Sequence, residues 1–229
     1  MKVILLAAGL GTRLRPITDT RPKCLVPVKG KPLLQIWLEN LNYVGLNDFL
    51  INTHYLSNQV DSFINNSIYK ENCVVRNEKI LLGTAGTLLS NLDYIGDEDC
   101  LLIHADNYCL ADIKKFLEAH KKRPKKCLMT MLTFRTNKPS TCGIVEVDKN
   151  NILVDFFEKV DNPPGNLANG AVYILSKELI NILATKNQLA TDFSNDIIPY
   201  FKNKIFTYET KELFIDIGTI NTYIEANNS

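Results

Sequence analysis

The sequence has almost no net charge, no closely paired cysteines and no long hydrophobic segment. Lys and Arg number 26 and Asp and Glu number 25, so the broad positive charge of a general nucleic-acid-binding protein is missing. The six cysteines form no CxxC motif, which argues against a zinc site or a redox pair. No apolar run reaches the ~18–20 residues that cross a bilayer. These absences predict a cytoplasmic protein without nucleic-acid or membrane partners.

The rest of the composition is that of an ordinary globular protein. Its 229 residues, 45% of them hydrophobic, can form one α/β domain over residues 1–229, with halves of about 1–110 and 111–229. Apolar runs predict strands at 2–7, 48–53, 73–76, 100–104, 127–134, 143–148, 153–158, 171–175, 205–208 and 213–216. Amphipathic segments predict helices at 32–44, 56–65, 110–121, 176–184, 192–200 and 219–226. Their alternation in the first half predicts a doubly wound, mixed, mainly parallel sheet flanked by helices.

The loop after the first strand carries residues suited to a triphosphate. Small residues such as Gly9 and Gly11 let backbone N–H groups approach phosphate oxygens, and Arg13 and Lys23 add positive charge. The spacing fits neither a P-loop nor a GxGxxG dinucleotide loop. Four prolines between residues 14 and 32 also exclude a helix directly after the glycines. A generic turn with surface cations remains the alternative for the glycines alone.

A set of motifs along the whole chain is far more specific than the glycine loop alone. The segment LAAGLGTRLRPITDTRPKCLVPVKGKP (6–32) resembles the signature of the sugar-1-phosphate nucleotidyltransferases. The resemblance continues, in the same order, through LLGTAGTL, LLIHADN, CGIVEVD, FEKV, NGAVYIL and FIDIGT. It implies a Rossmann-like nucleotidyltransferase fold, and an enzyme that joins a nucleoside monophosphate to a sugar 1-phosphate.

The resemblance assigns nucleotide contacts to the glycine loop and to LGTAG. The implied nucleotide-binding residues are Leu6, Ala7, Ala8, Gly9, Gly11, Thr12, Arg13, Lys23, Glu78, Gly83 and Thr84. Glu78 is a candidate for the edge of the base, with a solvated turn residue as the alternative. Ile80 and Leu81 depart from the acid and proline that are common in this segment of the family.

The resemblance also assigns a sugar-phosphate site and a metal site. The implied sugar-phosphate ligands are Gly143, Glu158, Lys159 and Asn169, with a solvated surface charge as the alternative for Lys159. Asp106 and Asp216 match the two carboxylates that hold Mg²⁺, a cation that prefers oxygen ligands. Each aspartate follows an apolar strand, so parallel strands would bring both to one sheet edge. The alternative for Asp106 is a helix N-cap or a turn residue.

The implied catalytic residues are Arg13, Lys23, Asp106 and Asp216. No covalent nucleophile is needed, because the sugar phosphate is already anionic. His104 is expected to pack at a strand end rather than to act as a base.

The motifs favour GTP and mannose- or heptose-1-phosphate as the substrates. A uridylyltransferase acting on an amino-sugar or N-acetylmuramate 1-phosphate, a transferase for another base, and a non-catalytic nucleotide-sugar sensor remain alternatives. The product would feed cell-surface polysaccharide synthesis. A homodimer remains open, and because the sequence ends soon after FIDIGT, the C-terminal β-helix of larger relatives is not expected.

Overall fold

The computed structural model describes residues 1–186 and 189–229, which form two compact units. The first unit contains Lys2–Leu81, Ile103–Leu110 and Leu213–Ser229, and the second contains Met1, Leu82–Leu102 and Ala111–Glu212. This division differs from the predicted one near residue 110, because the last residues of the chain belong with the first ones. The assignment of residues 1–229 to a single domain stays a prediction.

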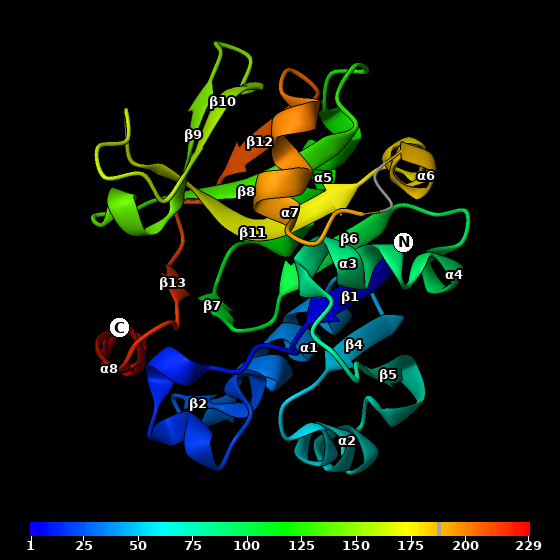
Figure 1. Ribbon diagram of the computed structural model, residues 1–229, viewed down its shortest axis with the longest axis vertical. Coiled ribbons are helices and arrows are strands. Elements are labelled where there is room, and N and C mark those ends of the chain that lie inside the picture. Colours follow the sequence, from blue (N-terminus) through cyan, green and yellow to red (C-terminus); the bar gives the residue numbers. More distant parts are fainter. Residues whose placement is uncertain (187–188) are drawn as a thin grey trace. The chain divides into compact units, whose positions relative to one another are not determined.

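The first unit is built on three parallel strands, which lie in order in Figure 1. They are β1 (Lys2–Leu6), β4 (Phe49–Thr53) and β5 (Cys73–Asn77), and Val3 lies opposite Phe49, which lies opposite Cys73. Nearly every residue of β1 and β4 is buried, as expected for strands covered on both faces. Helices α1 (Leu33–Tyr43) and α2 (Ser57–Asn65) connect them, which confirms the βαβ alternation.

Short elements occupy the rest of the first unit. They are the 3₁₀ turns η1 (Thr12–Leu14), η2 (Ile17–Asp19), η3 (Lys23–Leu25) and η4 (Lys70–Asn72), strands β2 (Pro27–Val28), β3 (Lys31–Pro32), β7 (Asn107–Cys109) and β13 (Phe214–Asp216), and helix α8 (Ile220–Asn228). Strand β6 (Cys100–His104) has residues in both units. The proline-rich loop after β1 forms 3₁₀ turns rather than an α-helix, as predicted.

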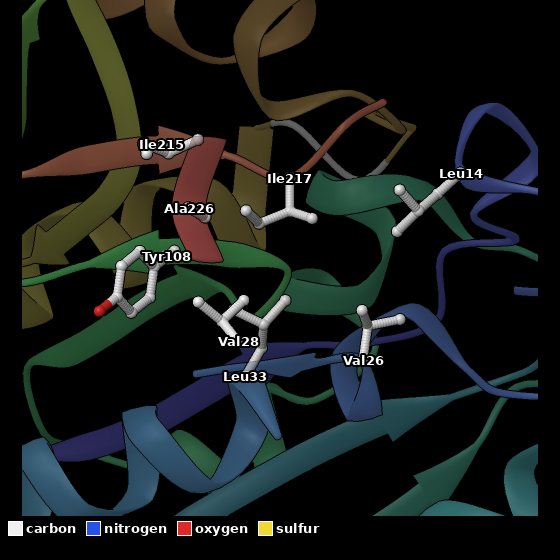
Figure 2. Packing of buried hydrophobic residues seen from close by; sticks show 8 residues of the cluster. All are labelled: Leu14, Val26, Val28, Leu33, Tyr108, Ile215, Ile217 and Ala226. Atoms are coloured by element: carbon white, nitrogen blue, oxygen red, sulfur yellow. The ribbon is translucent and has the colours of Figure 1, made fainter. Parts of the chain in front are cut away.

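The C-terminal segment packs onto the N-terminal loop through an apolar cluster. Figure 2 shows this cluster, which joins Leu14, Val26, Val28, Leu33, Tyr108, Ile215, Ile217 and Ala226. Beside it, β13 pairs with β7, and Asp216 lies opposite Asn107. The two aspartates are brought together by this antiparallel pair, whereas the sequence suggested parallel strands that end at one sheet edge. Hydrogen bonding between β7 and β13 places Asp216 directly across from the neighbour of Asp106.

The second unit is a mixed sheet with helices. It contains α3 (Gly83–Leu89), α4 (Leu92–Ile95), α5 (Ile113–Lys122), β8 (Met129–Arg135), η5 (Pro139–Thr141), β9 (Gly143–Val147), β10 (Leu153–Glu158), β11 (Leu167–Leu175), α6 (Lys177–Lys186), α7 (Phe193–Asp196), η6 (Ile198–Phe201) and β12 (Ile205–Glu209). Strand β8 pairs with β12 in parallel and with β11 antiparallel, and β9 lies antiparallel to both β10 and β11. The predicted antiparallel additions in the second half are therefore confirmed.

Two predicted elements differ most from the structure in their bounds. The helix expected over 192–200 is interrupted: Asp192 caps α7 by accepting the Asn195 N–H, and a 3₁₀ turn containing Pro199 follows. Proline lacks the N–H that a continued α-helix would need and clashes with the preceding turn. Strand β11 begins at Leu167 rather than residue 171. Its register against β8 shifts between Asn169 and Tyr173, which is the mark of a β-bulge.

Most of the cysteines lie in the interior of the protein. All six cysteines are free, and Cys24, Cys100, Cys109 and Cys127 are buried, where a thiol packs as a small apolar group. Among the described residues, no helix combines the length and the apolar character that a membrane crossing requires.

Candidate functional site

The turn after β1 is shaped by Gly11. Its backbone has φ +65°, and a Cβ at this position would lie 2.9 Å from Thr18 Cγ2. The Thr18 hydroxyl and the Leu14 N–H both donate to the Gly11 carbonyl, at 2.7 and 2.9 Å. At Gly9, by contrast, no described atom lies within 4 Å of an added Cβ. Gly11 is therefore needed for the turn, whereas Gly9 leaves open space beside it.

A buried polar chain holds the start of this loop. The Ala7 N–H donates to Asn52 Oδ1 at 2.8 Å, and Asn52 Nδ2 donates to Glu78 Oε1 at 2.9 Å. Both Asn52 and Glu78 are buried, so the alternative of Glu78 as a solvated turn residue is wrong. The Ala7 amide is already bonded, which leaves the later residues of the loop as the candidate donors to phosphate.

Lys23 connects two carboxylates. Its Nζ lies 2.6 Å from Asp106 Oδ2 and 3.6 Å from Asp216 Oδ1, and its side chain is only 10% exposed. The side chains of Asp106 and Asp216 are 30% and 55% exposed. All three residues belong to the first unit. The two predicted metal carboxylates therefore converge on one predicted phosphate-binding lysine.

Arg13 lies at the same cluster. A Cβ added to Gly218 would lie 3.4 Å from both Arg13 Nη2 and Asp216 Oδ2, so guanidinium and carboxylate flank this glycine. The positive charge of Arg13 also lowers the pKa of Lys23 slightly. The structure thus brings together all four residues that were predicted to be catalytic.

The turn that carries Asp106 is anchored on both sides. The Ala105 N–H donates to the Leu6 carbonyl at 3.0 Å, and Trp37 Nε1 donates to the Asn107 carbonyl at 3.0 Å. Asp106 thus lies in a turn, which was one of its two alternative interpretations, and the N-cap of α5 is Asp112. Trp37 lies within the helix that the periodicity predicts over 32–44. Nothing in the pattern indicated that its indole N–H positions this turn.

Burial and charge act in opposite directions on these groups. Burial lowers the pKa of Lys23, but attraction to Asp106 and Asp216 outweighs burial, and the pKa is raised above its usual value. Burial likewise raises the pKa of Asp106, yet the attraction and hydrogen bond of Lys23, together with the electrostatic interaction with His104, hold it below the usual range. Lys23 is therefore an ammonium and Asp106 a carboxylate near neutral pH.

The two aspartates of this cluster are the candidate ligands for a metal ion. Among residues 1–186 and 189–229, no group of three or more His, Cys, Asp or Glu side chains is arranged to bind a metal ion. The aspartate pair supplies hard oxygen donors, which suit Mg²⁺. Mg²⁺ commonly binds through one or two carboxylates together with phosphate and water, so two aspartates fit such an ion when a phosphate is bound.

In the second unit, the LGTAG segment packs against residues 191–193. Gly83 has φ +77°, and a Cβ there would lie 2.3 Å from the Thr191 carbonyl oxygen. The Ala85 N–H donates to that oxygen at 2.9 Å, and Thr84 Oγ1 accepts the Phe193 N–H at 2.7 Å. Gly83 is thus required by its own surroundings, whatever it contributes to a ligand.

Gly143, Glu158 and Lys159 gather at the end of the β9–β10 pair. Gly143 lies opposite Glu158, and a Cβ on Gly143 would lie 2.5 Å from Glu158 Oε2 and 2.6 Å from Phe156 Cζ. Lys159 Nζ lies 2.7 Å from Glu158 Oε1 and the lysine side chain is 64% exposed. The Lys159 backbone has φ +49°, which is uncommon for a residue with a side chain.

Asn169 lies at the bulge of β11 and is held at both ends of its amide. Its Nδ2 donates to the Tyr173 hydroxyl at 2.6 Å, and its Oδ1 accepts the N–H of Ala171, whose φ is +52°. Burial raises the pKa of Tyr173, and the charge of Glu158 raises it further. Tyr173 therefore links Asn169 to the surroundings of Glu158. Tyr173 lies in the apolar run NGAVYIL, and for that reason the sequence pattern did not indicate a polar role for its hydroxyl.

The chain belongs to the nucleotidyl transferase family, whose model matches residues 2–229. This match confirms the family inferred from the motifs.

Three similar proteins refine the comparison. The "Putative mannose-1-phosphate guanyltransferase" of Sulfolobus acidocaldarius is 30% identical over 99% of this chain, and the chain spans 62% of its length. The D-glycero-alpha-D-manno-heptose 1-phosphate guanylyltransferase of Aneurinibacillus thermoaerophilus is 26% identical, and 99% of this chain covers 96% of it. The crystal structure of HddC from Yersinia pseudotuberculosis complexed with GMP-PN is 28% identical, covers 99% of this chain and 98% of its own, and has a TM-score of 0.82. These likenesses confirm the mixed, mainly parallel sheet flanked by helices.

Proposed function

We propose that the protein transfers a nucleoside monophosphate from a nucleoside triphosphate to a sugar 1-phosphate. A phosphate oxygen of the sugar 1-phosphate attacks the α-phosphorus, a new P–O bond forms, and the bond to the β-phosphate oxygen breaks as pyrophosphate leaves. The convergence of Arg13, Lys23, Asp106 and Asp216 in the first unit carries this proposal. The two cations can bind the phosphates of the two anionic substrates, and the two carboxylates can hold a metal ion between them.

Arg13 and Lys23 are the proposed phosphate ligands. Both are cations near the glycine turn, and fixed positive charge stabilises the charge that develops on the α-phosphate and the leaving pyrophosphate. The proposed nucleotide contacts also include Gly9 and Thr12, and the family resemblance adds Gly83 and Thr84. The hydrogen-bonded chain of Glu78, Asn52 and Ala7 holds the start of this loop.

Asp106 and Asp216 are the proposed Mg²⁺ ligands, because they are hard oxygen donors that already converge on a positive group. When bound, Mg²⁺ would offset the repulsion between the two phosphates and orient them. The β7–β13 pair holds Asp216 opposite Asn107, the neighbour of Asp106, and so keeps the two aspartates near each other.

Gly143, Glu158, Lys159 and Asn169 are the proposed sugar-phosphate ligands. The exposed Lys159 ammonium can meet the phosphate, and Glu158 and Asn169 offer a carboxylate and an amide for hydroxyl groups. The positive φ angles at Lys159 and Ala171 add support, because backbone in such sparsely populated regions clusters at ligand sites.

GTP with mannose- or heptose-1-phosphate is the proposed substrate pair. Two similar proteins are described as guanylyltransferases for these sugars, and HddC was crystallised with GMP-PN. We further propose a cytoplasmic enzyme that supplies activated sugar for cell-surface polysaccharide, and a homodimer as its assembly.

Pyrophosphate release tests the proposal directly. Purified protein with Mg²⁺ would be assayed with GTP, UTP, dTTP, CTP and ATP against the 1-phosphates of mannose, heptose, glucose, N-acetylglucosamine and N-acetylmuramate. The expected result is one strong response, with GTP and mannose- or heptose-1-phosphate. A response with UTP and an amino-sugar phosphate would replace that pair by the uridylyltransferase alternative. Absence of release in every combination, from folded protein, would support a non-catalytic sensor.

A further inference from the structure

The carboxylates proposed to bind Mg²⁺ are already bridged by a cation of the protein itself. Lys23 Nζ contacts Asp106 Oδ2 at 2.6 Å and lies 3.6 Å from Asp216 Oδ1. This lysine is almost completely buried, in contrast to Lys159, whose ammonium is largely solvated beside Glu158. The Lys23 ammonium therefore supplies the positive charge that holds the two aspartates together.

The surroundings of Lys23 keep it at this position. Lys23 begins η3 directly after Pro22, and the Val26 N–H donates to its carbonyl at 3.1 Å. On the other side, its Cβ is so near Gly11 that an added Cβ would lie 3.3 Å away. Packing at both ends of the residue favours one arrangement of the buried side chain, directed at the carboxylates.

Such an arrangement opposes the entry of a free divalent cation. Asp106 Oδ2 already accepts a charge-assisted hydrogen bond from the ammonium, and a second cation placed at this carboxylate pair is repelled by the ammonium. The ammonium cannot simply leave, because a buried charge without a partner is strongly unfavourable. Another anion must therefore pair with the lysine before it can leave the aspartates. A nucleotide phosphate is the anion that the proposed reaction brings to this loop.

We propose that Lys23 is an internal counterion of the Asp106–Asp216 pair. It keeps free divalent cations from binding these carboxylates until its ammonium pairs with a nucleotide phosphate instead. This inference rests on the proposed function for the identity of that phosphate. It makes Lys23 a positioning residue for the metal carboxylates as well as a phosphate ligand, and it predicts that metal and nucleotide enter together.

Direct metal binding to the nucleotide-free protein tests this. Mn²⁺ would serve as the probe, and its binding would be followed by electron paramagnetic resonance and calorimetry in the wild-type protein and in Lys23→Met. The expected result is at least about tenfold tighter Mn²⁺ binding in Lys23→Met, and loss of that gain when Asp106→Asn is added. About tenfold corresponds to a typical coupling between two interacting ligands.

Matched variants separate charge from shape. Lys23→Arg keeps a cation and should bind Mn²⁺ as weakly as the wild type. Lys23→Gln is neutral and should bind Mn²⁺ as tightly as Lys23→Met. The glutamine variant also keeps the test possible if the methionine variant does not fold. Lys70→Met is the control, since Lys70 is an exposed lysine of the same unit. Equal Mn²⁺ affinity in wild type and the neutral variants, whether measurable or absent, would overturn the proposal.

Turnover of the wild-type protein is measured separately. Pyrophosphate release together with unchanged Mn²⁺ binding in the neutral variants would refute the counterion role alone. Tighter Mn²⁺ binding in the neutral variants without pyrophosphate release from the wild type would instead refute the proposed function and leave the closed carboxylate pair in place.

Discussion

Two lysine–carboxylate pairs, one in each unit, have nearly the same length and different surroundings. Lys23 lies 2.6 Å from Asp106 and is 10% exposed, whereas Lys159 lies 2.7 Å from Glu158 and is 64% exposed. Water screens the second pair, so its contribution to stability is small, about 0–1 kcal/mol. The first pair is held where charges interact more strongly. Distance alone therefore does not tell which lysine is fixed and which is free to meet a ligand.

A second difference is the number of anions. Lys23 also lies near Asp216, whose attraction adds to that of Asp106 in raising the pKa of the ammonium. Lys159 forms its ion pair with one carboxylate, that of Glu158. The comparison suggests that the first cluster is preorganised before substrates bind, while the second is completed by a ligand.

The largest expected effect comes from removing one carboxylate of the first cluster. Asp106→Asn and Asp216→Asn should each lower turnover about 10²–10³-fold or more, a range typical for loss of one group that stabilises transition-state charge. Asp106→Asn should also lower the free energy of unfolding, because it weakens the main partner of a buried ammonium. Steady-state kinetics and urea unfolding measure both. Near-normal turnover in either variant would contradict the metal assignment.

The next effect tests how the exposed pair is positioned. Gly143→Ala would place a Cβ 2.5 Å from Glu158 Oε2 and 2.6 Å from Phe156 Cζ, so one of these groups must move. We expect a loss of about 1–3 kcal/mol of unfolding free energy and a raised KM for the sugar phosphate. Gly165→Ala is the matched control, since no described atom lies within 4 Å of an added Cβ there. Equal stability of the two variants would show that Glu158 and Phe156 yield without cost.

A smaller effect is expected from the exposed lysine itself. Lys159→Ala should raise the KM for the sugar 1-phosphate about tenfold, or about 1.4 kcal/mol, while the unfolding free energy changes by less than about 0.5 kcal/mol. Lys149→Ala, which removes an exposed turn lysine of the same unit, should change neither quantity. A defect confined to nucleotide KM would move Lys159 to the other substrate.

The smallest effect concerns a third basic group beside a carboxylate. His120 is buried, its Nδ1 contacts Thr130 Oγ1 at 2.8 Å, and its Nε2 lies 3.6 Å from Asp99, beyond hydrogen-bonding distance. Burial therefore dominates and lowers the pKa of His120, the opposite of Lys23.

A lowered histidine pKa has a defined sign in stability. Below the usual pKa of about 6.5 the unfolded chain takes up a proton that the folded protein does not, so stability falls as the pH drops through this value. Thermal unfolding between about pH 7.5 and about pH 5.5 should show this fall. His120→Gln should reduce the slope, and an unchanged slope would mean that other groups cause it.

Much of the fold could be predicted because its signals are local. Continuous apolar runs such as residues 2–7 indicate buried strands, and helical periodicity located α1 and α2. The predicted helix over 192–200 is longer than the observed one because the apolar spacing continues past Pro199, which an α-helix does not tolerate in its interior. The start of β11 was missed because the bulge at Ala171 interrupts the alternation on which strand prediction depends.

The sequence by itself determined the family, the glycine turn and the residue types that phosphate chemistry needs, since short motifs record local geometry and charge. Only the tertiary structure decided which of these residues meet. The antiparallel pairing of β7 with β13 brings Asp216 to Asp106 across more than a hundred residues of chain. Burial then turned Lys23, but not Lys159, into a fixed counterion. Contacts between distant segments and exclusion of water depend on packing of the whole unit, which no local pattern contains.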